Sequence, residues 1–416
     1  MQRRRIMKQN LIRLASAVLA GSLCMGLSAC GEPGTGSGGD AKEGKKSVKV
    51  GLICLHDENS TYDLNFLNGL NEAKKALGLS DDQVIIKKNI PESNECKEAA
   101  VDLADRGCDI IFADSFGHEP YLLEAAEAYP DVQFCHATGT LAHTEKRDNF
   151  HDAFASIYEG RYLAGIAAGL KLNEMIDDGK IKPEEAVMGY VGAYTYAEVI
   201  SGYTSFYLGA KSVCPSTTMK VQFTGSWYDE TAEKEAATKL ISQNCVLISQ
   251  HADSMGAPTA CENGRVPNIS YNGSTKDACP NTFIVSSRID WMPYYVYAIQ
   301  CVQNGEQIKT DWVGDLSTGS VRLTEVNEQA AAAGTQAAID EAAAKLKSGE
   351  LHVFDTSAFT VEGKMLTTYQ ADVDTDAEYT PDTEVIKDGY FHESEYRSAP
   401  YFDIKIDGIE QLNTMF

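Results

Sequence analysis

The chain has 416 residues, of which 60 are acidic and 36 are basic, so its formal net charge at neutral pH is −24. A protein this acidic repels polyphosphates, and the charge therefore argues against a function in nucleic-acid binding. The length, with 43% hydrophobic residues, is enough for two domains that each have a core.

The N-terminus predicts a signal peptide over residues 1–29. Residues 1–13 carry five basic side chains and no acid, and the run LASAVLAGSLCMGLSA that follows is apolar and rich in small residues. This run is too short for a comfortable membrane span. Its end, Leu27-Ser28-Ala29-Cys30, resembles the lipobox of bacterial lipoproteins, which implies cleavage before Cys30 and a lipid on its thiol. The alternative is an ordinary signal peptide with a chance cysteine.

A flexible linker is predicted over residues 30–46. The stretch GEPGTGSGGDAKEGKKS has no apolar side chain that could pack, which is typical of a tether between a membrane anchor and a folded body. It contains the spacing Gly34-x-Gly36-x-x-Gly39, formally a dinucleotide fingerprint, but no strand precedes it and no helix follows. We therefore expect no cofactor. Cleavage before Cys30 would leave 31 basic and 60 acidic residues, a net charge of −29.

From Val48 onwards, short apolar strand patterns alternate with helical patterns. The strand patterns lie at residues 47–55, 84–90, 108–114 and 132–139, and the helical patterns between them at 63–78, 94–106 and 119–129. This order predicts a parallel sheet with helices on both faces. The rhythm restarts with a helical pattern at residue 157 and continues to a last strand pattern at 283–289. The chain is therefore predicted to be an α/β protein with two Rossmann-like lobes.

The predicted domain boundaries follow from these two units. The first lobe takes residues 47–155 with about 290–320, and the second takes 156–289 with about 321–355. Glycine, proline, aspartate and tyrosine are scattered through residues 356–416. We therefore expect an irregular C-terminal extension over the lobes and not a third domain.

The cysteines predict no metal or redox site. Nine remain after Cys24 and Cys30 are set aside, and the chain has no CxxC spacing. Cys54, Cys108 and Cys135 sit in apolar strand patterns, which is typical of small core residues. Whether Cys261 and Cys279 form a disulfide stays open.

Candidate ligand-binding residues lie where the predicted strands end, because open α/β sheets bind ligands beyond the carboxyl ends of their strands. Aromatic rings there could stack on a small flat molecule, and a carboxylate could accept hydrogen bonds from its hydroxyls. A single aromatic residue near a strand end more often packs in the core. The predicted ligand-binding residues are Thr61, Tyr62, Ser115, Phe116, Trp227, His251, Asp253, Asn272, Gly273 and Trp291.

Catalytic signatures are missing from the sequence. It has no HExxH, no G-x-S-x-G and no P-loop. His251 beside Asp253 could suggest acid–base chemistry, but a binding role is the simpler interpretation. The string Asp372-x-Asp374-x-Asp376 begins like a calcium loop and lacks its later glycine and glutamate. We therefore predict no enzyme, no catalytic residue and no metal.

Several short motifs resemble the basic membrane protein (BMP) family between about residues 48 and 355. They are Ser115-Phe116-Gly117, His136-Ala137-Thr138-Gly139, IYEGRYLAG at 157–165, Trp227-Tyr228-Asp229, Gln250-His251-Ala252-Asp253-Ser254 and Trp291-x-Pro293-Tyr294-Tyr295.

The resemblance implies a lipoprotein of the type I periplasmic-binding-protein fold. Such a protein captures a purine nucleoside or base between its lobes, by aromatic stacking and a ribose-binding aspartate, and delivers it to an ABC permease. This sequence departs from the family at Asn59-Ser60-Thr61-Tyr62, which lacks the usual first-strand motif, and in the tail after Asp355.

The expected function is thus that of a solute-binding protein on the extracytoplasmic face of the cell membrane, anchored by lipid on Cys30. Two alternatives stay open. One is a binding protein for a sugar or another small metabolite, whose sites use the same aromatic and carboxylate side chains. The other is an extracellular nucleoside hydrolase, for which the sequence offers no catalytic constellation.

Overall fold

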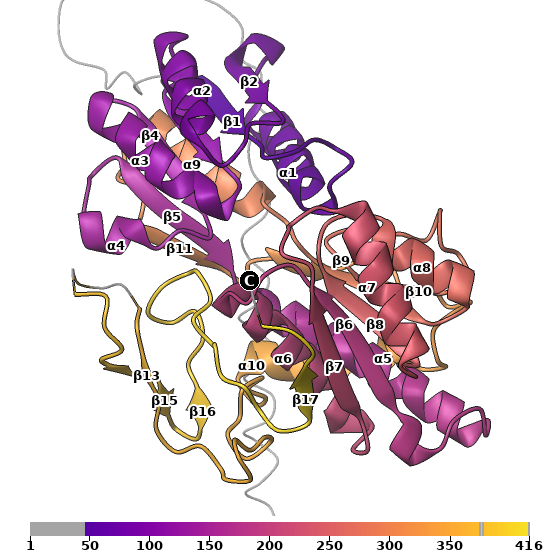
Figure 1. Ribbon diagram of the computed structural model, residues 1–416. Helices are drawn as coiled ribbons and strands as arrows, with labels where there is room; N and C mark the ends of the chain where they lie inside the picture. Colours follow the sequence, from indigo (N-terminus) through magenta and orange to yellow (C-terminus); the bar gives the residue numbers. More distant parts are fainter. Residues whose placement is uncertain (1–45, 374–375, 377, 415–416) are drawn as a thin grey trace, which may run out of the picture. The chain divides into compact units, whose positions relative to one another are not determined.

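The computed structural model describes residues 46–373, 376 and 378–414, which belong to one compact unit, Lys45–Phe416 (Figure 1). The predicted signal peptide, the lipidation site Cys30 and nearly all of the predicted linker lie outside the described residues. No helix in the described part of the chain is long and apolar enough to cross a membrane.

Two mainly parallel sheets form the framework, which confirms the predicted α/β class. The first sheet has the order β11-β5-β4-β3-β1-β2, and all its neighbouring strands are parallel. Its strands are β1 (Val50–Ile53), β2 (Val84–Lys87), β3 (Ile110–Ala113), β4 (Gln133–Ala137), β5 (Phe150–Ala155) and β11 (Asp311–Gly314). The helices of this lobe are α1 (Thr61–Leu77), α2 (Asn94–Asp105), α3 (Glu119–Ala128), α4 (Leu141–Glu145) and α9 (Met292–Asn304).

The second sheet has the order β12-β10-β9-β8-β6-β7-β17, and only β12 runs antiparallel to its neighbour. Its strands are β6 (Val187–Gly192), β7 (Thr218–Phe223), β8 (Leu247–His251), β9 (Asn268–Tyr271), β10 (Phe283–Ile289), β12 (Val321–Leu323) and β17 (Ile409–Gln411). The remaining helices are α5 (Ile157–Asp177), α6 (Ala197–Val213), α7 (Glu230–Ser242), α8 (Gly256–Gly264) and α10 (Thr335–Ser348). The chain crosses between the sheets after β5, after β10 and after β11.

Local sequence signals explain where several helices begin and end. Ser60 caps α1 by accepting a hydrogen bond from the amide of Asp63, and Gly78 ends that helix in the left-handed conformation with φ of 68°. Asp229 caps α7 in the same way through the amide of Ala232.

Helices α5 and α6 pack against each other at backbone distance because glycines face the contact. A Cβ atom at Gly165 would lie 2.1 Å from the carbonyl oxygen of Phe206, and one at Gly209 would lie 2.0 Å from that of Tyr162. Any larger side chain would force the helices apart. This close contact fixes the start of α6, which carries part of the site described below.

The C-terminal extension follows a mostly irregular path and carries five short strands among its described residues. Its strand β17 pairs in parallel with β7 and becomes the edge of the second sheet. Two short hairpins precede it, β13 (Gln370–Ala371) with β14 (Thr383–Glu384) and β15 (Ile386–Lys387) with β16 (Tyr390–Phe391). Phe402 lies 4.8 Å from Phe391 and 6.2 Å from Phe359 between ring centres, so the extension has an aromatic core of its own. The sequence lacked a clear period here because these strands are two or three residues long.

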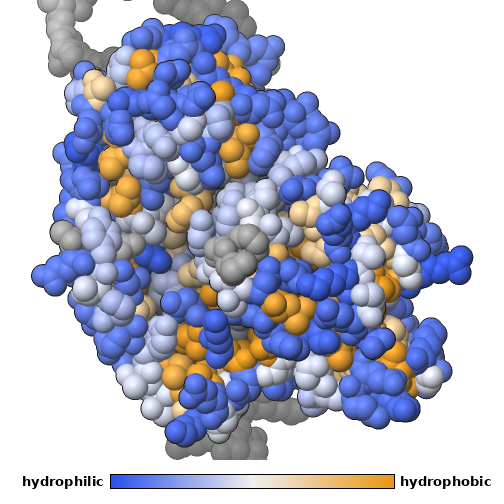
Figure 2. All heavy atoms as spheres, in the orientation of Figure 1, coloured by the Kyte–Doolittle hydropathy of each residue, from blue (hydrophilic) through white to orange (hydrophobic). Residues whose placement is uncertain are grey.

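All nine cysteines from Cys54 to Cys301 are buried and free, so Cys261 and Cys279 form no disulfide. Figure 2 shows that hydrophilic residues cover most of the face in view, with hydrophobic residues in scattered patches. This surface agrees with the strong acid excess of the composition.

Candidate ligand-binding site

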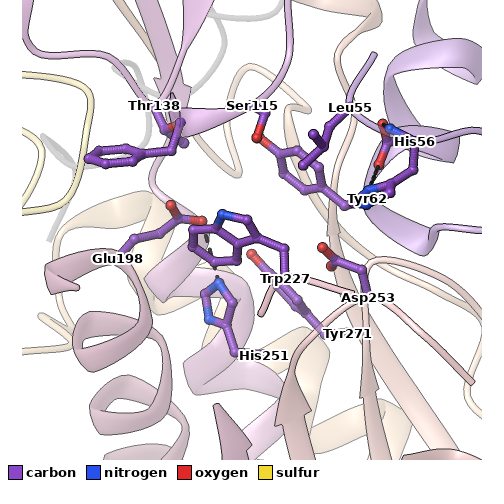
Figure 3. Close-up of a pocket in the computed structure, with 12 residues that line it drawn as sticks. Leu55, His56, Tyr62, Ser115, Thr138, Glu198, Trp227, His251, Asp253 and Tyr271 are labelled. Carbon is purple, nitrogen blue, oxygen red and sulfur yellow. Dashed lines mark hydrogen bonds and ion pairs between the residues drawn. The ribbon is translucent and has the colours of Figure 1, made fainter. Parts of the chain in front are cut away.

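A cavity lies between the two sheets, where strands of both lobes end (Figure 3). We call it the inner cavity. It lies at the carboxyl ends of β1, β3 and β4 in the first lobe and of β7, β8 and β9 in the second, as expected for open parallel sheets. Its lining residues are Leu55, His56, Tyr62, Asp63, Ser115, Phe116, Thr138, Glu198, Trp227, His251, Asp253 and Tyr271.

The inner cavity is small. It holds about 360 Å³ of space free of protein atoms, part of it open to solvent.

Hydrogen bonds join the lobes beside the cavity. The amide of Thr61, in the first lobe, donates to the carbonyl oxygen of Asp253 in the second at 3.1 Å. The side-chain amide of Asn65 donates to the carbonyl oxygen of Asn272 at 3.1 Å. These bonds show that the lobes are closed on each other in this structure.

The first-lobe wall is built on two buried carboxyl groups. Asp63 accepts hydrogen bonds from the amide of His56 at 2.8 Å and from the hydroxyl of Ser60 at 2.6 Å. Burial opposes ionisation of Asp63, but these hydrogen bonds keep its pKa below the ordinary value. Asp114 behind it accepts from the amide of Leu55 at 3.0 Å. Burial, and then the charge of Asp63, raise the pKa of Asp114 well above its usual range.

The second-lobe wall presents side chains from three strand ends and from the first turn of α6. The ring of His251 lies 4.5 Å from that of Tyr271, and its Nε2 lies 3.4 Å from Oε1 of Glu198. Burial lowers the pKa of His251 in spite of this carboxylate. Burial, and then the neighbouring carboxylates of Asp63, Glu233 and Glu198, raise the pKa of Asp253.

The hydroxyl of Tyr271 lines the inner cavity, is buried, and has no hydrogen-bond partner in the described part of the chain. A buried polar atom without a partner is costly, so this hydroxyl is a candidate contact for a ligand.

A buried arginine supports that wall from below. Arg161 of α5 is fully buried, and its guanidinium group donates to the hydroxyls of Tyr190 and Ser249 at 2.9 Å each. It also lies 5.0 Å from the ring centre of Tyr271. The cation thus packs against the ring of Tyr271.

Six of the ten predicted ligand-binding residues line the inner cavity: Tyr62, Ser115, Phe116, Trp227, His251 and Asp253. Thr61, Asn272 and Gly273 lie instead in the contact between the lobes, where Asn272 also donates to Oδ1 of Asp253 at 3.3 Å. The structure does not bring Trp291 to the cavity. Its side chain is 2% exposed and stacks on Phe66 of α1 at 4.2 Å, so it packs in the core of the first lobe.

The other six lining residues, Leu55, His56, Asp63, Thr138, Glu198 and Tyr271, were not predicted. His56 directly follows a predicted strand and Thr138 lies at the end of another, so the rule about strand ends could have found them. Glu198 lies in the first turn of a helix, and Tyr271 is the last residue of a strand. No sequence signal tells which way their side chains point.

Two buried groups of side chains have the spacing of metal ligands, Cys54–Asp63–Asp114 and Glu119–His136–Asp152. In the first group the carboxylates accept backbone hydrogen bonds. In the second, a Cβ atom on Gly139 would lie 2.2 Å from Asp152 and 2.5 Å from both Glu119 and His136. The missing side chain of Gly139 therefore leaves a space that these three side chains border.

Comparison with known proteins identifies the family of this chain. Residues 53–355 match the family model Bmp, described as ABC transporter substrate-binding protein PnrA-like. The chain belongs to the Bmp family. It is therefore a solute-binding protein of an ABC transporter, and not an enzyme. The resemblance drawn from the short motifs is confirmed.

Among similar proteins, a purine-binding protein of Brucella abortus is 29% identical over 320 residues, 76% of this chain and 85% of that protein. A putative ABC transporter glucose-binding protein of Haloferax volcanii is 32% identical over 257 residues, 61% of each chain. The solved structure of an ABC transporter solute-binding protein from Conexibacter woesei shares the fold. It has a TM-score of 0.59 and 23% identity, and the match covers 73% of this Bmp protein and 98% of the other chain.

Proposed function

We propose that this Bmp protein captures a purine nucleoside or the free base in the inner cavity and delivers it to an ABC importer. The observation that carries the proposal is a small cavity between two lobes, with aromatic rings, with polar atoms that have no hydrogen-bond partner, and with no lysine or arginine among its lining residues.

The aromatic lining favours a flat ring. Trp227 lies 5.0 Å from Tyr194 and 6.0 Å from Tyr196 between ring centres, and Tyr196 lies 5.2 Å from Phe116 of the opposite lobe. Stacking on such side chains contributes about 1–3 kcal/mol per nucleobase. A purine placed against Trp227 would lie with its edge toward the carboxylates of the second lobe.

The polar lining favours an uncharged ligand that donates hydrogen bonds. Three carboxyl groups, those of Asp63, Glu198 and Asp253, line the inner cavity, together with two histidines. A phosphate would meet these acids with no lysine or arginine to offset the repulsion, which disfavours a nucleotide. The carboxyl group of Asp253 beside the amide of Asn272 offers acceptors and donors to a pair of ribose hydroxyls.

The relatives support a small neutral ligand but differ about its class. The Brucella protein is named for purine binding and the Haloferax protein for glucose binding. A sugar is therefore the second candidate, favoured by the higher identity of the Haloferax protein over its shorter match. The aromatic side chains of the lining favour the purine.

Ligand binding has to shift the lobes toward the closed form. A permease can recognise the ligand-bound protein by its closed form only if the ligand binds the closed form more tightly than the open one. The hydrogen bonds between Thr61 and Asp253 and between Asn65 and Asn272 belong to the closed form, and they lie next to the proposed ribose site. Ribose contacts and lobe closure would thus reinforce each other.

A thermal-shift and calorimetric panel tests the ligand class. Purine nucleosides, free bases, glucose and other sugars are each added to the purified protein. A ligand at a hundred times its dissociation constant adds about 2.7 kcal/mol to the free energy of unfolding. A shift with purines alone supports the proposal, and a shift with sugars alone replaces the purine by a sugar. Released free base in the same samples would indicate a hydrolase instead.

We also propose that the protein is held at the outer face of the membrane by lipid on Cys30, on the strength of the lipobox-like sequence. Two lipid chains anchor a protein stably, whereas one short chain does not. Replacing Cys30 by alanine should release the protein from the membrane fraction. Mass spectrometry of the mature N-terminus should find diacylglycerol on Cys30, and an unmodified N-terminus would contradict the anchor.

A further inference from the structure

A second, larger cavity adjoins the inner one, and we call it the outer cavity. It encloses about 1040 Å³ of space free of protein atoms, part of it open to solvent, against about 360 Å³ for the inner cavity. Phe116, Thr138 and Glu198 line both. The two cavities therefore share a boundary, and a ligand in one can reach into the other.

The C-terminal extension forms the far wall of the outer cavity. Its contribution includes Tyr369, Gln370, Arg397, Pro400, Tyr401 and Asp403. This wall lies outside the region that matches the Bmp family, which ends at residue 355. The outer cavity is thus a feature that this chain adds to the family fold.

Contacts with both lobes hold the wall in place. The amide of Ser398 donates to Oδ2 of Asp311 in the first lobe at 2.5 Å. Five residues earlier, the carbonyl oxygen of Glu393 accepts from the hydroxyl of Tyr158 in the second lobe at 3.3 Å. The wall is therefore positioned when the lobes are closed, which is the form that retains a ligand.

Two aromatic side chains from opposite lobes meet at the boundary. Phe116 of the first lobe and Tyr196 of the second are 40% and 39% exposed, which is unusual among the large hydrophobic residues described here. Their ring centres are 5.2 Å apart, and both line the outer cavity. Exposed aromatic rings facing a cavity offer contact area to an apolar or aromatic group.

The side chains at the two ends of the inner cavity determine how a purine nucleoside would be oriented in it. Figure 3 shows Asp253 at one end, and Thr138 and Glu198 at the other, with Trp227 between them. If ribose binds at Asp253 and the purine lies along Trp227, the purine edge remote from the ribose faces Thr138 and Glu198. That edge carries the 6-substituent of the purine, and it opens into the outer cavity.

We propose that the outer cavity is a second binding compartment, which accepts an aromatic or alkyl group attached to position 6 of a purine nucleoside. The rings of Tyr196, Tyr369 and Tyr401 would pack against this group. The proposal rests on the proposed function, because it needs a purine nucleoside in the inner cavity. It makes the C-terminal extension part of the binding site and not only a cover.

Isothermal titration of the full chain with matched ligands tests the compartment. Adenosine is compared with N6-benzyladenosine, and guanosine with O6-benzylguanosine, so that whichever parent nucleoside binds has its own benzyl derivative. We expect the wild type to bind the derivative at least as tightly as the parent. A derivative that binds more than about tenfold weaker than its parent would overturn the proposal, since it would mean that the substituent meets a closed wall.

A first variant tests where the benzyl substituent binds. Tyr369→Ala removes an aromatic ring of the extension that lines only the outer cavity. It should weaken the benzyl derivative by about fivefold to tenfold and change the parent by less than about twofold. Tyr379→Ala is the matched control, because Tyr379 is exposed on the same extension and lines neither cavity.

Ala197→Phe provides a second variant that fills the outer cavity from the second lobe. It should weaken binding of the derivative while the parent still binds, and circular dichroism checks that both variants fold. Equal effects of these variants on parent and derivative would overturn the compartment. If the wild type binds no purine nucleoside at all, the proposed function fails first and the compartment with it.

Discussion

The two lobes share an architecture but hold the polar side chains of the inner cavity in different ways. In the first lobe, Asp63 accepts hydrogen bonds from the amide of His56 and the hydroxyl of Ser60, so groups of the same lobe satisfy it, whereas Asp114 behind it accepts from the amide of Leu55 and keeps its Oδ2 without a partner in the described structure. In the second lobe, a buried cation supports the wall from beneath, and the hydroxyl of Tyr271 stays without a partner in the described structure. The comparison suggests that the first lobe supplies a fixed surface and the second supplies the contacts that select the ligand.

The largest effect is expected from removing the buried cation of the second lobe. Arg161→Met would leave the hydroxyls of Tyr190 and Ser249 without their donor inside the core. The free energy of unfolding should fall by about 3 kcal/mol, measured by urea denaturation. Arg265→Met, at an exposed position of the same lobe, should stay within about 0.5 kcal/mol of the wild type. Equal stability of the two variants would mean that Arg161 does not support the wall.

The second prediction concerns how carboxyl groups in the two lobes make the free energy of unfolding depend on pH. Burial raises the pKa of Glu233, behind Asp253, to about 7 from 4.5. A carboxyl group whose pKa is raised by folding destabilises the protein as pH rises from the unfolded toward the folded value. Glu233→Gln removes this penalty, so the variant should gain about 2 kcal/mol more stability over the wild type at pH 8 than at pH 5.

Asp63 of the first lobe should show the opposite dependence. Its folded pKa is lowered, so its contribution to stability is present above the unfolded pKa and is lost as pH falls through the folded one. Thermal melts of Glu233→Gln and Asp63→Asn at several pH values measure both slopes against the wild type. If the stability of both variants relative to the wild type changed with pH in the same direction, the two lobes would not differ in their pH dependence.

A third prediction separates the two carboxyl groups of the first lobe. The carboxyl group of Asp63 accepts hydrogen bonds from both His56 and Ser60, and Asp63→Asn removes one of its two acceptor oxygens. This variant should lower the free energy of unfolding by about 2 kcal/mol. Asp114→Asn resembles the protonated form that burial already favours at this position, so it should cost less than about 0.5 kcal/mol. Urea denaturation of both variants at pH 7 measures the difference. A larger cost for Asp114→Asn than for Asp63→Asn would mean that Asp114, and not Asp63, carries the negative charge of the pair.

The smallest expected change is in the free energy of ligand binding. Asp253→Ala should weaken nucleoside binding by about tenfold, because a hydrogen bond between the ligand and a carboxyl group is lost. Ser115→Ala in the first lobe should change affinity by less than about threefold, since the Ser115 hydroxyl already donates to Glu92 at 2.6 Å. Isothermal titration of both variants checks this contrast, and unchanged affinity in Asp253→Ala would remove Asp253 from the site.

The strand ends account for what could be predicted about the site. Trp227, His251 and Asp253 directly follow or end predicted strands, and the structure brings all three to one cavity. Trp291 follows a strand too, but the start of α9 turns it against Phe66 of α1, more than two hundred residues earlier in the chain. A strand pattern gives the end of a strand and not the direction of the next side chain.

The sequence by itself determined the alternation of strands and helices, the two parallel sheets and the edge at which polar side chains gather, because these follow from hydrophobic period and helix caps along a continuous stretch of chain. Only the tertiary structure decided that Arg161 supports Tyr271, that Glu198 joins the cavity, and that residues 369–403 line a second cavity beside it. Each of these depends on contacts between segments far apart in the chain, whose packing leaves no periodic signal in either segment alone.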